Sequence, residues 1–255
     1  EISTVVGCRM NCDYCPQKIH VQKYTEKTRH TKMTYHDFKT MLSSVPLDVE
    51  IVFAGMAEPW LNPNCTDMVL NAFDKGYKVG IYTTLAGMAP SDLSKIQRLK
   101  FEFFTLHLPD ADGIMTLDVN SRYLGLLSSV LSQIDCQKMV IGKLHPEVEK
   151  LTGPVKDGSV GLFSRAGNLK TLAINKKSGP LQCSACGPKI DHNILLPNGD
   201  VLLCCMDYGQ EHVIGNLLKM SYSELFESAE YLRVMDGLKN DSNILCRKCE
   251  VSKPI

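Results

Sequence analysis

The placement of the cysteines constrains this chain more than any other feature of its sequence. Nine of its 11 cysteines fall into two groups, one towards each end of the 255 residues. The groups are Cys8, Cys12 and Cys15, and then Cys183, Cys186, Cys204, Cys205, Cys246 and Cys249. A disulfide-bonded fold spreads its cysteines through a much smaller domain, whereas grouped cysteines indicate metal binding or redox chemistry. The sequence therefore predicts two metal centres.

The charge balance limits the partners of the chain. Lys and Arg together number 28, and Asp and Glu together also number 28. A chain without excess positive charge lacks the electrostatic attraction that nucleic-acid-binding proteins use. It contains no run of about 20 apolar residues that would cross a membrane, and no signal segment opens it. We predict a cytoplasmic protein with no nucleic-acid or membrane partner.

Short β-rich segments alternate with amphipathic segments from residue 2 to about residue 174. This alternation is typical of repeated strand–helix units around a parallel sheet. We predict strands at 2–6, 49–54, 78–83, 101–107, 138–142 and 169–174, and helices at 34–44, 64–75, 91–99 and 121–133. Six such units are fewer than the eight of a complete TIM barrel. The predicted fold is α/β, a partial (β/α)6 TIM-like barrel over residues 1–177.

The sequence changes character after Ser178-Gly179-Pro180, which predicts a second domain over residues 178–255. Two β-rich segments flank Asn198-Gly199, a pair that supplies the positive φ angles of a tight hairpin turn. Ser221 and Glu224 form a capping-box pattern that begins a helix. The apolar residues expected on one face of that helix are Leu225, Leu232, Val234 and Leu238. We predict a small C-terminal domain made of a β-hairpin and a helix.

The first cysteine group follows directly on the first predicted strand. Cys8, Cys12 and Cys15 therefore lie at the carboxyl edge of the sheet, where α/β folds bind their ligands. Three thiolates without a local fourth suit an iron–sulfur cluster that has one open iron. Zinc is the alternative, since it prefers four ligands and His20 is near enough to be the fourth.

The spacing C-x3-C-x2-C, with Tyr14 just before the third cysteine, resembles the motif of the radical S-adenosylmethionine (SAM) superfamily. In that family the open iron of a [4Fe-4S] cluster binds the amino and carboxylate groups of SAM. Reduction by one electron yields a 5′-deoxyadenosyl radical, which abstracts hydrogen from the substrate. The resemblance implies that Tyr14 lies against the adenine of SAM.

Further segments at successive strand ends are similar to the same family. Gly55-Met-Ala57-Glu58-Pro59 resembles the Gly-Gly-Glu-Pro segment that receives the SAM amino group, with Ala57 in place of the second glycine. Thr83 and Thr84 end the third predicted strand, where the family has a polar position near the SAM ribose, and His107 ends the fourth. The cofactor-binding residues implied by this resemblance are Tyr14, Gly55, Ala57, Glu58, Thr83, Thr84 and His107.

The second cysteine group completes a four-thiolate set. The hairpin brings Cys186 and Cys204 together, and the following helix is able to return Cys246 and Cys249 to the same place. Zinc and [4Fe-4S] both accept four thiolates, so the residues alone do not choose between them.

The spacing C-x12-G-x4-C around Gly199 resembles the auxiliary-cluster domains called SPASM and twitch. SPASM domains hold two clusters with seven or more cysteines, so a single four-cysteine set resembles the shorter twitch form. The resemblance implies a second [4Fe-4S] cluster. Cys183 and Cys205 compete as ligands with Cys186 and Cys204, but only the latter pair fits both gaps around Gly199.

Size and layout resemble the twitch-domain dehydrogenases that oxidise a ring hydroxyl of an aminocyclitol. The resemblance implies an oxidoreductase for a small sugar- or aminocyclitol-like substrate, with the auxiliary cluster accepting an electron. It also implies a reducing partner such as flavodoxin or ferredoxin, and a substrate contact by Arg165. Among the polar residues after Cys204, we select Asp207 as the base that takes the hydroxyl proton.

Three other functions fit the same residues. A sugar epimerase needs a hydrogen donor, for which Cys205 or Cys183 is available. A peptide-modifying radical SAM enzyme often carries an N-terminal peptide-recognition domain, and this chain starts at its first strand, which favours a small substrate. A metal-stabilised binding protein is the alternative without catalysis. The isolated Cys65 and Cys136 are predicted to be small buried apolar residues.

Overall fold

A parallel four-stranded sheet runs through the first part of the chain. The computed structural model describes residues 1–156, 163–170 and 174–255. The strands pair in chain order as β1 (Ile51–Phe53), β2 (Val79–Thr83), β3 (Phe103–His107) and β4 (Gln137–Met139). Their register aligns the strand ends, with Phe53 opposite Ile81 and Thr83 opposite Leu106. All four strands are parallel, so their carboxyl ends meet at one edge.

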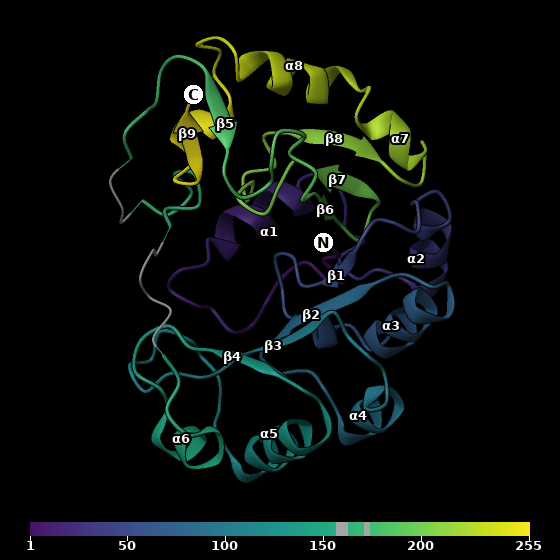
Figure 1. The fold of residues 1–255 in the computed structure, drawn as a ribbon, viewed down its shortest axis with the longest axis vertical. Helices are drawn as coiled ribbons and strands as arrows, with labels where there is room; N and C mark the ends of the chain where they lie inside the picture. Colours follow the sequence, from purple (N-terminus) through teal and green to yellow (C-terminus); the bar gives the residue numbers. More distant parts are fainter. Residues whose placement is uncertain (157–162, 171–173) are drawn as a thin grey trace.

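Helices cover the outer side of this sheet (Figure 1). They are α2 (Tyr35–Leu42), α3 (Cys65–Asp74), α4 (Pro90–Ile96), α5 (Ser121–Gln133) and α6 (Pro146–Thr152). Thr34 caps α2 by accepting a hydrogen bond from the Asp37 backbone N–H, and Asn120 caps α5 in the same way. Phe38, Met68 and Leu127 are fully buried between helices and sheet, as apolar residues on the inner faces of amphipathic helices should be.

The predicted strand at 2–6 is wrong in its extent. Ile2 alone bridges β1 at Phe53 and, on its other side, Leu195 of β6 (Ile194–Leu195). The backbone N–H of Met33 then binds the Thr4 carbonyl, and that of Val6 binds the Thr31 carbonyl. The segment therefore changes pairing partner after two residues, which prevents one continuous ladder. Residues 171–173 of the weak strand predicted at 169–174 lie outside the described residues.

Two helices of the barrel were not expected. Helix α1 (Gln17–Thr25) follows the first cysteine group and buries only Gln17, His20 and Tyr24, so its sequence carries no apolar periodicity. Helix α6 is short, begins at Pro146 after His145, and ends at Gly153. A start by proline and a stop by a glycine with positive φ are the usual helix boundaries.

The predicted hairpin forms in the C-terminal unit, as part of a three-stranded antiparallel sheet whose third strand was not predicted. Strand β6 pairs with β7 (Asp200–Leu202), and β7 pairs with β8 (Val213–Asn216). Gly199 takes φ +89° in the turn. A second pair joins β5 (Leu181–Cys183) to β9 (Ser252–Pro254), and the 3-10 helix η2 (Leu245–Lys248) precedes β9.

The helix predicted after Ser221 is two helices. The capping box forms, with the Ser221 N–H donating to Glu224 Oε2 over 2.6 Å, but α7 (Tyr222–Leu225) lasts only one turn. Ser228 then caps a separate helix, α8 (Ala229–Gly237), by accepting from the Tyr231 N–H. Leu232 is 53% exposed, so the predicted apolar face is wrong at that position. A second cap inside the segment overrides the continuous apolar pattern.

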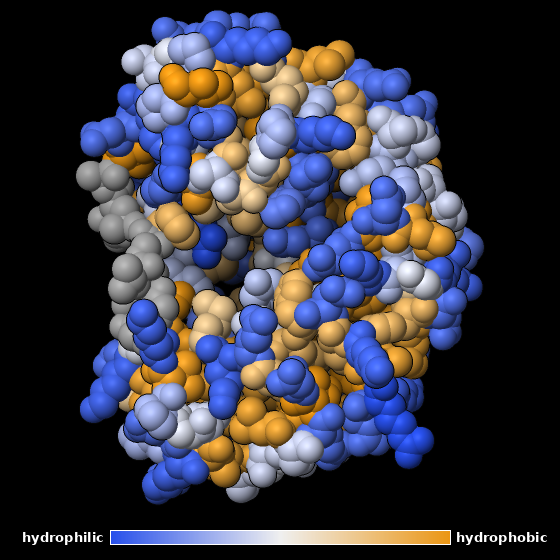
Figure 2. Space-filling view, in the orientation of Figure 1, coloured by the Kyte–Doolittle hydropathy of each residue, from blue (hydrophilic) through white to orange (hydrophobic). Residues whose placement is uncertain are grey.

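The two units meet along the first residues of the chain. Ile2 lies between β1 and β6, and the N-terminus lies at the centre of Figure 1, where the two sheets approach each other. Figure 2 shows the same face hollowed between the barrel and the C-terminal unit. Division of the chain at 177/178 stays a prediction. No helix among the described residues is long and apolar enough to span a membrane.

Candidate active site

One pocket gathers most of the residues that the sequence singles out. It has a volume of about 320 Å³ and lies at the carboxyl edge of the sheet. Its lining includes Cys8, Cys12, Tyr14, Cys15, Gly55, Ala57, Glu58, Thr83, Thr84, His107, Arg165 and Cys205. Every predicted cofactor-binding residue is among them. Asp207 is not.

The loop that carries Cys8, Cys12 and Cys15 is held by its neighbour after β3. The Asp13 N–H donates to the Ile114 carbonyl over 3.0 Å, and the Thr116 N–H donates to the Met10 carbonyl over 2.8 Å. The buried Asp110 carboxylate shapes that neighbouring segment by accepting from three of its backbone N–H groups. Hydrogen bonds to the segment after β3 therefore hold the cysteine loop in place.

Two side chains meet the sulfur of Cys15. Gln17 donates to Cys15 Sγ over 3.5 Å and also binds the Met56 carbonyl, so it connects the cysteine loop to the segment after β1. The Cys15 thiol also donates to the hydroxyl oxygen of Tyr208, from the C-terminal unit, over 3.5 Å. Hydrogen bonds to cluster sulfurs are one of the factors that set reduction potential. Nothing in the sequence pointed to Gln17, because the Met56 carbonyl that it binds is 39 positions away along the chain.

The thiols of this loop are suited to a metal centre. Burial raises the pKa of Cys8, and raises the pKa of Cys12 to about 12. Neutral thiols are therefore favoured in the protein itself, and a bound metal cation reverses this preference because a coordinating thiol is deprotonated. The three thiols of this loop therefore suit a bound metal centre, whose strong positive charge favours their deprotonated form.

A single zinc ion does not fit the same residues. His20 is fully buried, its Nδ1 lies 3.4 Å from Gln210 Nε2, and burial lowers its pKa to about 4. Among the described residues, no three His, Cys, Asp or Glu side chains converge on one point. Ligands of one zinc ion each lie about 2.0–2.3 Å from it. An iron–sulfur cluster accepts its thiolates on separate irons and needs no such convergence.

Glu58 lies at the bottom of the pocket with a fully engaged carboxylate. Oε1 accepts from Thr83 Oγ1 over 2.7 Å and from the Trp60 N–H, while Oε2 accepts from the N–H and Oγ1 of Thr84, both over 2.7 Å. Burial raises the pKa of Glu58, and the Thr84 and Thr83 hydrogen bonds oppose that rise. A carboxylate offers about four acceptor positions. An ammonium group reaching Glu58 therefore has to replace one of the two threonine hydroxyls.

Replacing Glu58 with Gln is expected to weaken SAM binding about 10- to 100-fold, because a charged hydrogen bond contributes about 1.5–3 kcal/mol. Calorimetric titration of the reconstituted protein with SAM under anaerobic conditions measures this. The matched control is Asp92→Asn, since Asp92 also accepts from a threonine hydroxyl and a backbone N–H but lies outside the pocket. Equal loss of affinity in both variants contradicts a local role for Glu58.

Gly55 is at a position where only glycine fits. Its φ is +69°, and a Cβ atom there would lie 2.9 Å from Ser3 Cβ. The loop after β1 therefore approaches the first residues of the chain closely enough to bring its backbone to the pocket wall. Ala57, two residues on, lines the pocket without such a constraint.

Tyr14 and His107 form one wall of the pocket. Their rings stack with centroids 5.5 Å apart and planes 23° apart, and the Tyr14 hydroxyl lies 3.3 Å from His107 Nε2. Burial, assisted by the charge of Arg165 and opposed by that of Asp110, lowers the pKa of His107 to about 4. The imidazole is therefore neutral at pH 7, and the pair presents an uncharged aromatic surface that suits a flat ring.

Arg165 reaches the pocket from a strained loop. Its φ is +54°, an uncommon conformation for a residue with a side chain. The Glu250 carboxylate accepts from the N–H groups of Ser164 and Ala166, and Asn168 Nδ2 donates to the Arg165 carbonyl over 2.7 Å. The guanidinium forms no ion pair with any described carboxylate, and its Nε is buried without a partner. Nη1 contacts Met206 Sδ over 3.9 Å, and the other donors of the guanidinium are available to a ligand.

Asp207 does not have the position expected of a base. It is fully buried and accepts from the backbone N–H groups of Glu211 and His212, over 2.7 and 2.8 Å. These bonds close the loop after β7 and turn the carboxylate away from the pocket. The placement argues against the proton-accepting role assigned to Asp207. Cys205, two residues earlier, does line the pocket.

The predicted auxiliary ligands are all buried and interact with one another. Electrostatic interactions link Cys186 with Cys204, Cys204 with Cys246, and Cys246 with Cys249. Burial raises the pKa of Cys246 to about 12. Cys183 is half-buried, and its Sγ accepts from the Cys186 N–H over 3.2 Å. Cys183 and Cys186, the two candidates for the first auxiliary ligand, therefore both lie at this site.

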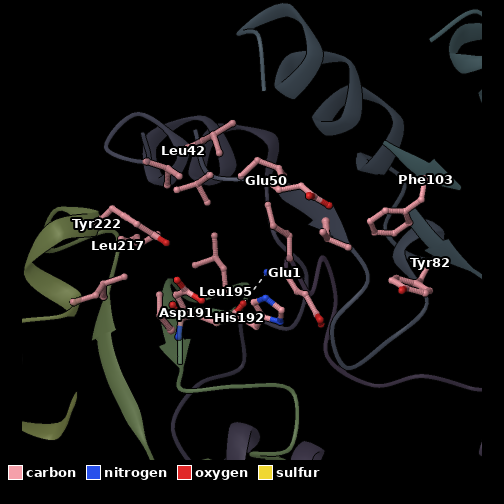
Figure 3. Close-up of a pocket in the computed structure, with 18 residues that line it drawn as sticks. Glu1, Leu42, Glu50, Tyr82, Phe103, Asp191, His192, Leu195, Leu217 and Tyr222 are labelled. Atoms are coloured by element: carbon pink, nitrogen blue, oxygen red, sulfur yellow. Dashed lines mark hydrogen bonds between the residues drawn. The ribbon is translucent and has the colours of Figure 1, made fainter. Parts of the chain in front are cut away.

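A second cavity of about 320 Å³ lies between β1, β2 and the C-terminal hairpin. Figure 3 shows it lined by Leu42, Leu195, Leu217 and Tyr222, with Asp191 and His192 at one side. It shares Glu1 and Tyr82 with the first pocket. None of the described residues that line this second cavity is a cysteine. The metal chemistry predicted from the cysteines therefore belongs to the first pocket.

Comparison with known proteins agrees with this geometry. Residues 183–250 match the SPASM family, described as an iron–sulfur cluster-binding domain. No curated protein matches the sequence significantly. Among solved structures, BtrN in complex with AdoMet and 2-DOIA has 19% identity and a TM-score of 0.63, covering 98% of this chain and 91% of its own.

Two further solved structures share the fold. Streptococcus suis SuiB bound to the precursor peptide SuiA has 13% identity and a TM-score of 0.61, covering 98% of this chain and 69% of its own. The enzyme anSMEcpe with bound AdoMet has 14% identity and a TM-score of 0.56, covering 98% of this chain and 85% of its own. The predicted fold, a partial α/β barrel with a small C-terminal iron–sulfur unit, is confirmed.

Proposed function

We propose, from the premise that the chain is a radical SAM fold with an SPASM iron–sulfur domain at residues 183–250, that it is an oxidoreductase for a small hydroxylated substrate. The substrate class is a sugar or an aminocyclitol-like ring. Cys8, Cys12 and Cys15 hold one [4Fe-4S] cluster, and Cys186, Cys204, Cys246 and Cys249 hold the other. A one-electron donor such as flavodoxin or ferredoxin is the proposed partner.

When bound, SAM and the two clusters supply a hydrogen-abstracting radical and an electron acceptor. The protein itself positions the cofactor and the substrate. Tyr14 and His107 offer a flat wall, Glu58 offers negative charge, and Arg165 offers unpaired donors facing the same space.

A single observation supports this function: Arg165 and Cys205 enter the pocket that contains the first cysteine group. Cys205 adjoins Cys204, and the Arg165 loop is bound to Glu250, the neighbour of Cys249. A substrate in this pocket therefore lies between the two proposed clusters.

Substrate-dependent cleavage of SAM tests the proposal. The reconstituted, chemically reduced protein is incubated with deuterated cyclitols, aminocyclitols including 2-deoxy-scyllo-inosamine, and hexoses, and 5′-deoxyadenosine is analysed by mass spectrometry. We expect deuterium in 5′-deoxyadenosine and a product lighter by two hydrogens with one member of the panel. Stimulation by unstructured peptides alone, or by no compound, overturns the assignment in favour of a peptide-modifying enzyme or a binding protein.

Epimerisation is a second candidate, because the Cys205 thiol lines the pocket. Burial raises the pKa of Cys205 to about 11, so the thiol keeps its proton at neutral pH. In an epimerase, the S–H bond would break as a new C–H bond forms on the opposite face of the ring. The resulting thiyl radical would take one electron from the neighbouring cluster and one proton from solvent.

Replacing Cys205 with Ala separates the two reactions. A dehydrogenase is expected to keep turnover within about threefold, because truncating one side chain beside the substrate costs only a fraction of a kcal/mol unless it reacts. Reactions in D2O followed by mass spectrometry provide the measurement. One solvent deuterium in the product of the unaltered protein, lost together with turnover in Cys205→Ala, identifies an epimerase instead.

A further inference from the structure

A buried cation lies inside the turn that carries two of the auxiliary ligands. Arg247 follows Cys246 in η2, two residues before Cys249. It is 0% exposed and is the largest fully buried side chain among the described residues. Arginine is almost never fully buried unless its charge is paired. The partners of Arg247 therefore need to be identified.

The chain gives Arg247 hydrogen bonds but little negative charge. Its two terminal nitrogens donate to the backbone carbonyls of Gly179 and Gly237, the latter over 2.7 Å. Its Nε is buried and has no partner. The nearest carboxylate among the described residues is Asp241, at 3.8 Å, and that side chain is 70% exposed. A solvated carboxylate at that distance compensates a buried guanidinium poorly.

A second cation, Lys177, contacts the same turn. Lys177 Nζ donates to the carbonyl of Cys249 over 2.6 Å and to the carbonyl and hydroxyl of Ser252. None of the described carboxylates pairs with Lys177. The turn that presents Cys246 and Cys249 therefore has two cations beside it, Arg247 and Lys177, neither of which forms an ion pair with the Glu250 carboxylate that follows Cys249.

The four auxiliary thiols supply the missing negative charge when they are ligands. All four are buried, and four thiolates leave a [4Fe-4S] cluster with a net negative charge. A fixed positive charge beside a cluster stabilises its reduced, more negative state, and net charge is one of the factors that set cluster potential.

We propose that Arg247 is the internal counter-charge of the auxiliary cluster and that it raises the reduction potential of that cluster. Arg247 is a positioning and tuning residue, since it touches neither substrate nor cofactor. The inference rests on the proposed function only in requiring a cluster at Cys186, Cys204, Cys246 and Cys249. Its consequence for that function is an auxiliary cluster that accepts an electron more readily.

Redox titration monitored by electron paramagnetic resonance tests the role of the charge. The full chain is used with Cys8, Cys12 and Cys15 replaced by Ala, so that only the auxiliary cluster is reduced. In this background we expect Arg247→Gln to shift the midpoint potential to a more negative value and Arg247→Lys to restore most of the shift. Lys248→Gln is the matched control, because it removes a charge from the same turn at a less buried position. An unchanged potential in iron-loaded Arg247→Gln overturns the proposal.

Asp241→Asn keeps the test decisive if Arg247→Gln fails to fold. Asp241 is exposed, and Asn retains an oxygen to accept from the Gly179 N–H, so the fold is preserved. Asp241 is the one carboxylate among the described residues that lies within 4 Å of Arg247, so its loss is expected to shift the potential to a less negative value, and no shift contradicts the proposal. Absence of the auxiliary cluster from the background protein itself, seen as no iron signal, contradicts the proposed function rather than the tuning.

Discussion

Replacing Cys12 with Ala is expected to abolish reductive cleavage of SAM and to lower the iron content from about eight to about four per chain, the difference being one four-iron cluster. In the proposed assignment three thiols from one loop hold the first cluster, so the loss of one leaves two ligands for four irons. Colorimetric iron analysis and detection of 5′-deoxyadenosine after reduction with dithionite measure the two effects.

Cys136→Ala is the control for this substitution. Cys136 lies outside both cysteine groups, is only half-buried rather than buried as expected, and donates to the Ile134 carbonyl. It should keep about eight irons and full SAM cleavage. SAM cleavage that survives in Cys12→Ala would exclude the first cysteine group as the site of radical formation.

Replacing Cys246 with Ala is expected to separate SAM cleavage from oxidation of the substrate. Iron content should again fall to about four per chain, SAM cleavage should continue, and formation of oxidised product should stop. The reason is that a substrate radical left in the pocket has lost its electron acceptor. Product analysis beside 5′-deoxyadenosine measurement distinguishes this uncoupled state from general inactivation.

The same measurements identify the remaining auxiliary ligand. The spacing around Gly199 predicts that Cys186→Ala loses about four irons, whereas Cys183→Ala keeps about eight. Oxidised product formed by Cys246→Ala at an undiminished rate contradicts the electron-accepting role. The reverse iron result for Cys183 and Cys186 corrects the ligand assignment and leaves that role intact.

Local sequence patterns predict much of this fold. The segments at 49–54, 78–83 and 101–107 are short and rich in β-branched and aromatic residues, a composition that predicts strands. The Asn198-Gly199 turn carries its own conformational preference. The pocket was predictable for the same reason, because successive parallel strands place their carboxyl ends at one edge.

Long-range contacts were not predictable. Gln17 acquires its role from the Met56 carbonyl, and Tyr208 acquires its role from Cys15, across 39 and 193 positions of the sequence respectively. The orientation of Asp207 depends on the loop after β7, where the backbone N–H groups of Glu211 and His212 donate to its carboxylate. Sequence periodicity carries no information about either kind of contact.

The bridge at Ile2 has a mechanical consequence. Ile2 pairs with both sheets, and the first cysteine group begins six residues later, while Cys204 follows the strand next to β6. Backbone hydrogen bonds rather than a linker therefore hold both proposed redox centres on one frame. A shift of one unit against the other would break the Ile2 pairing, so we expect this pairing to oppose changes in the distance between the two proposed centres.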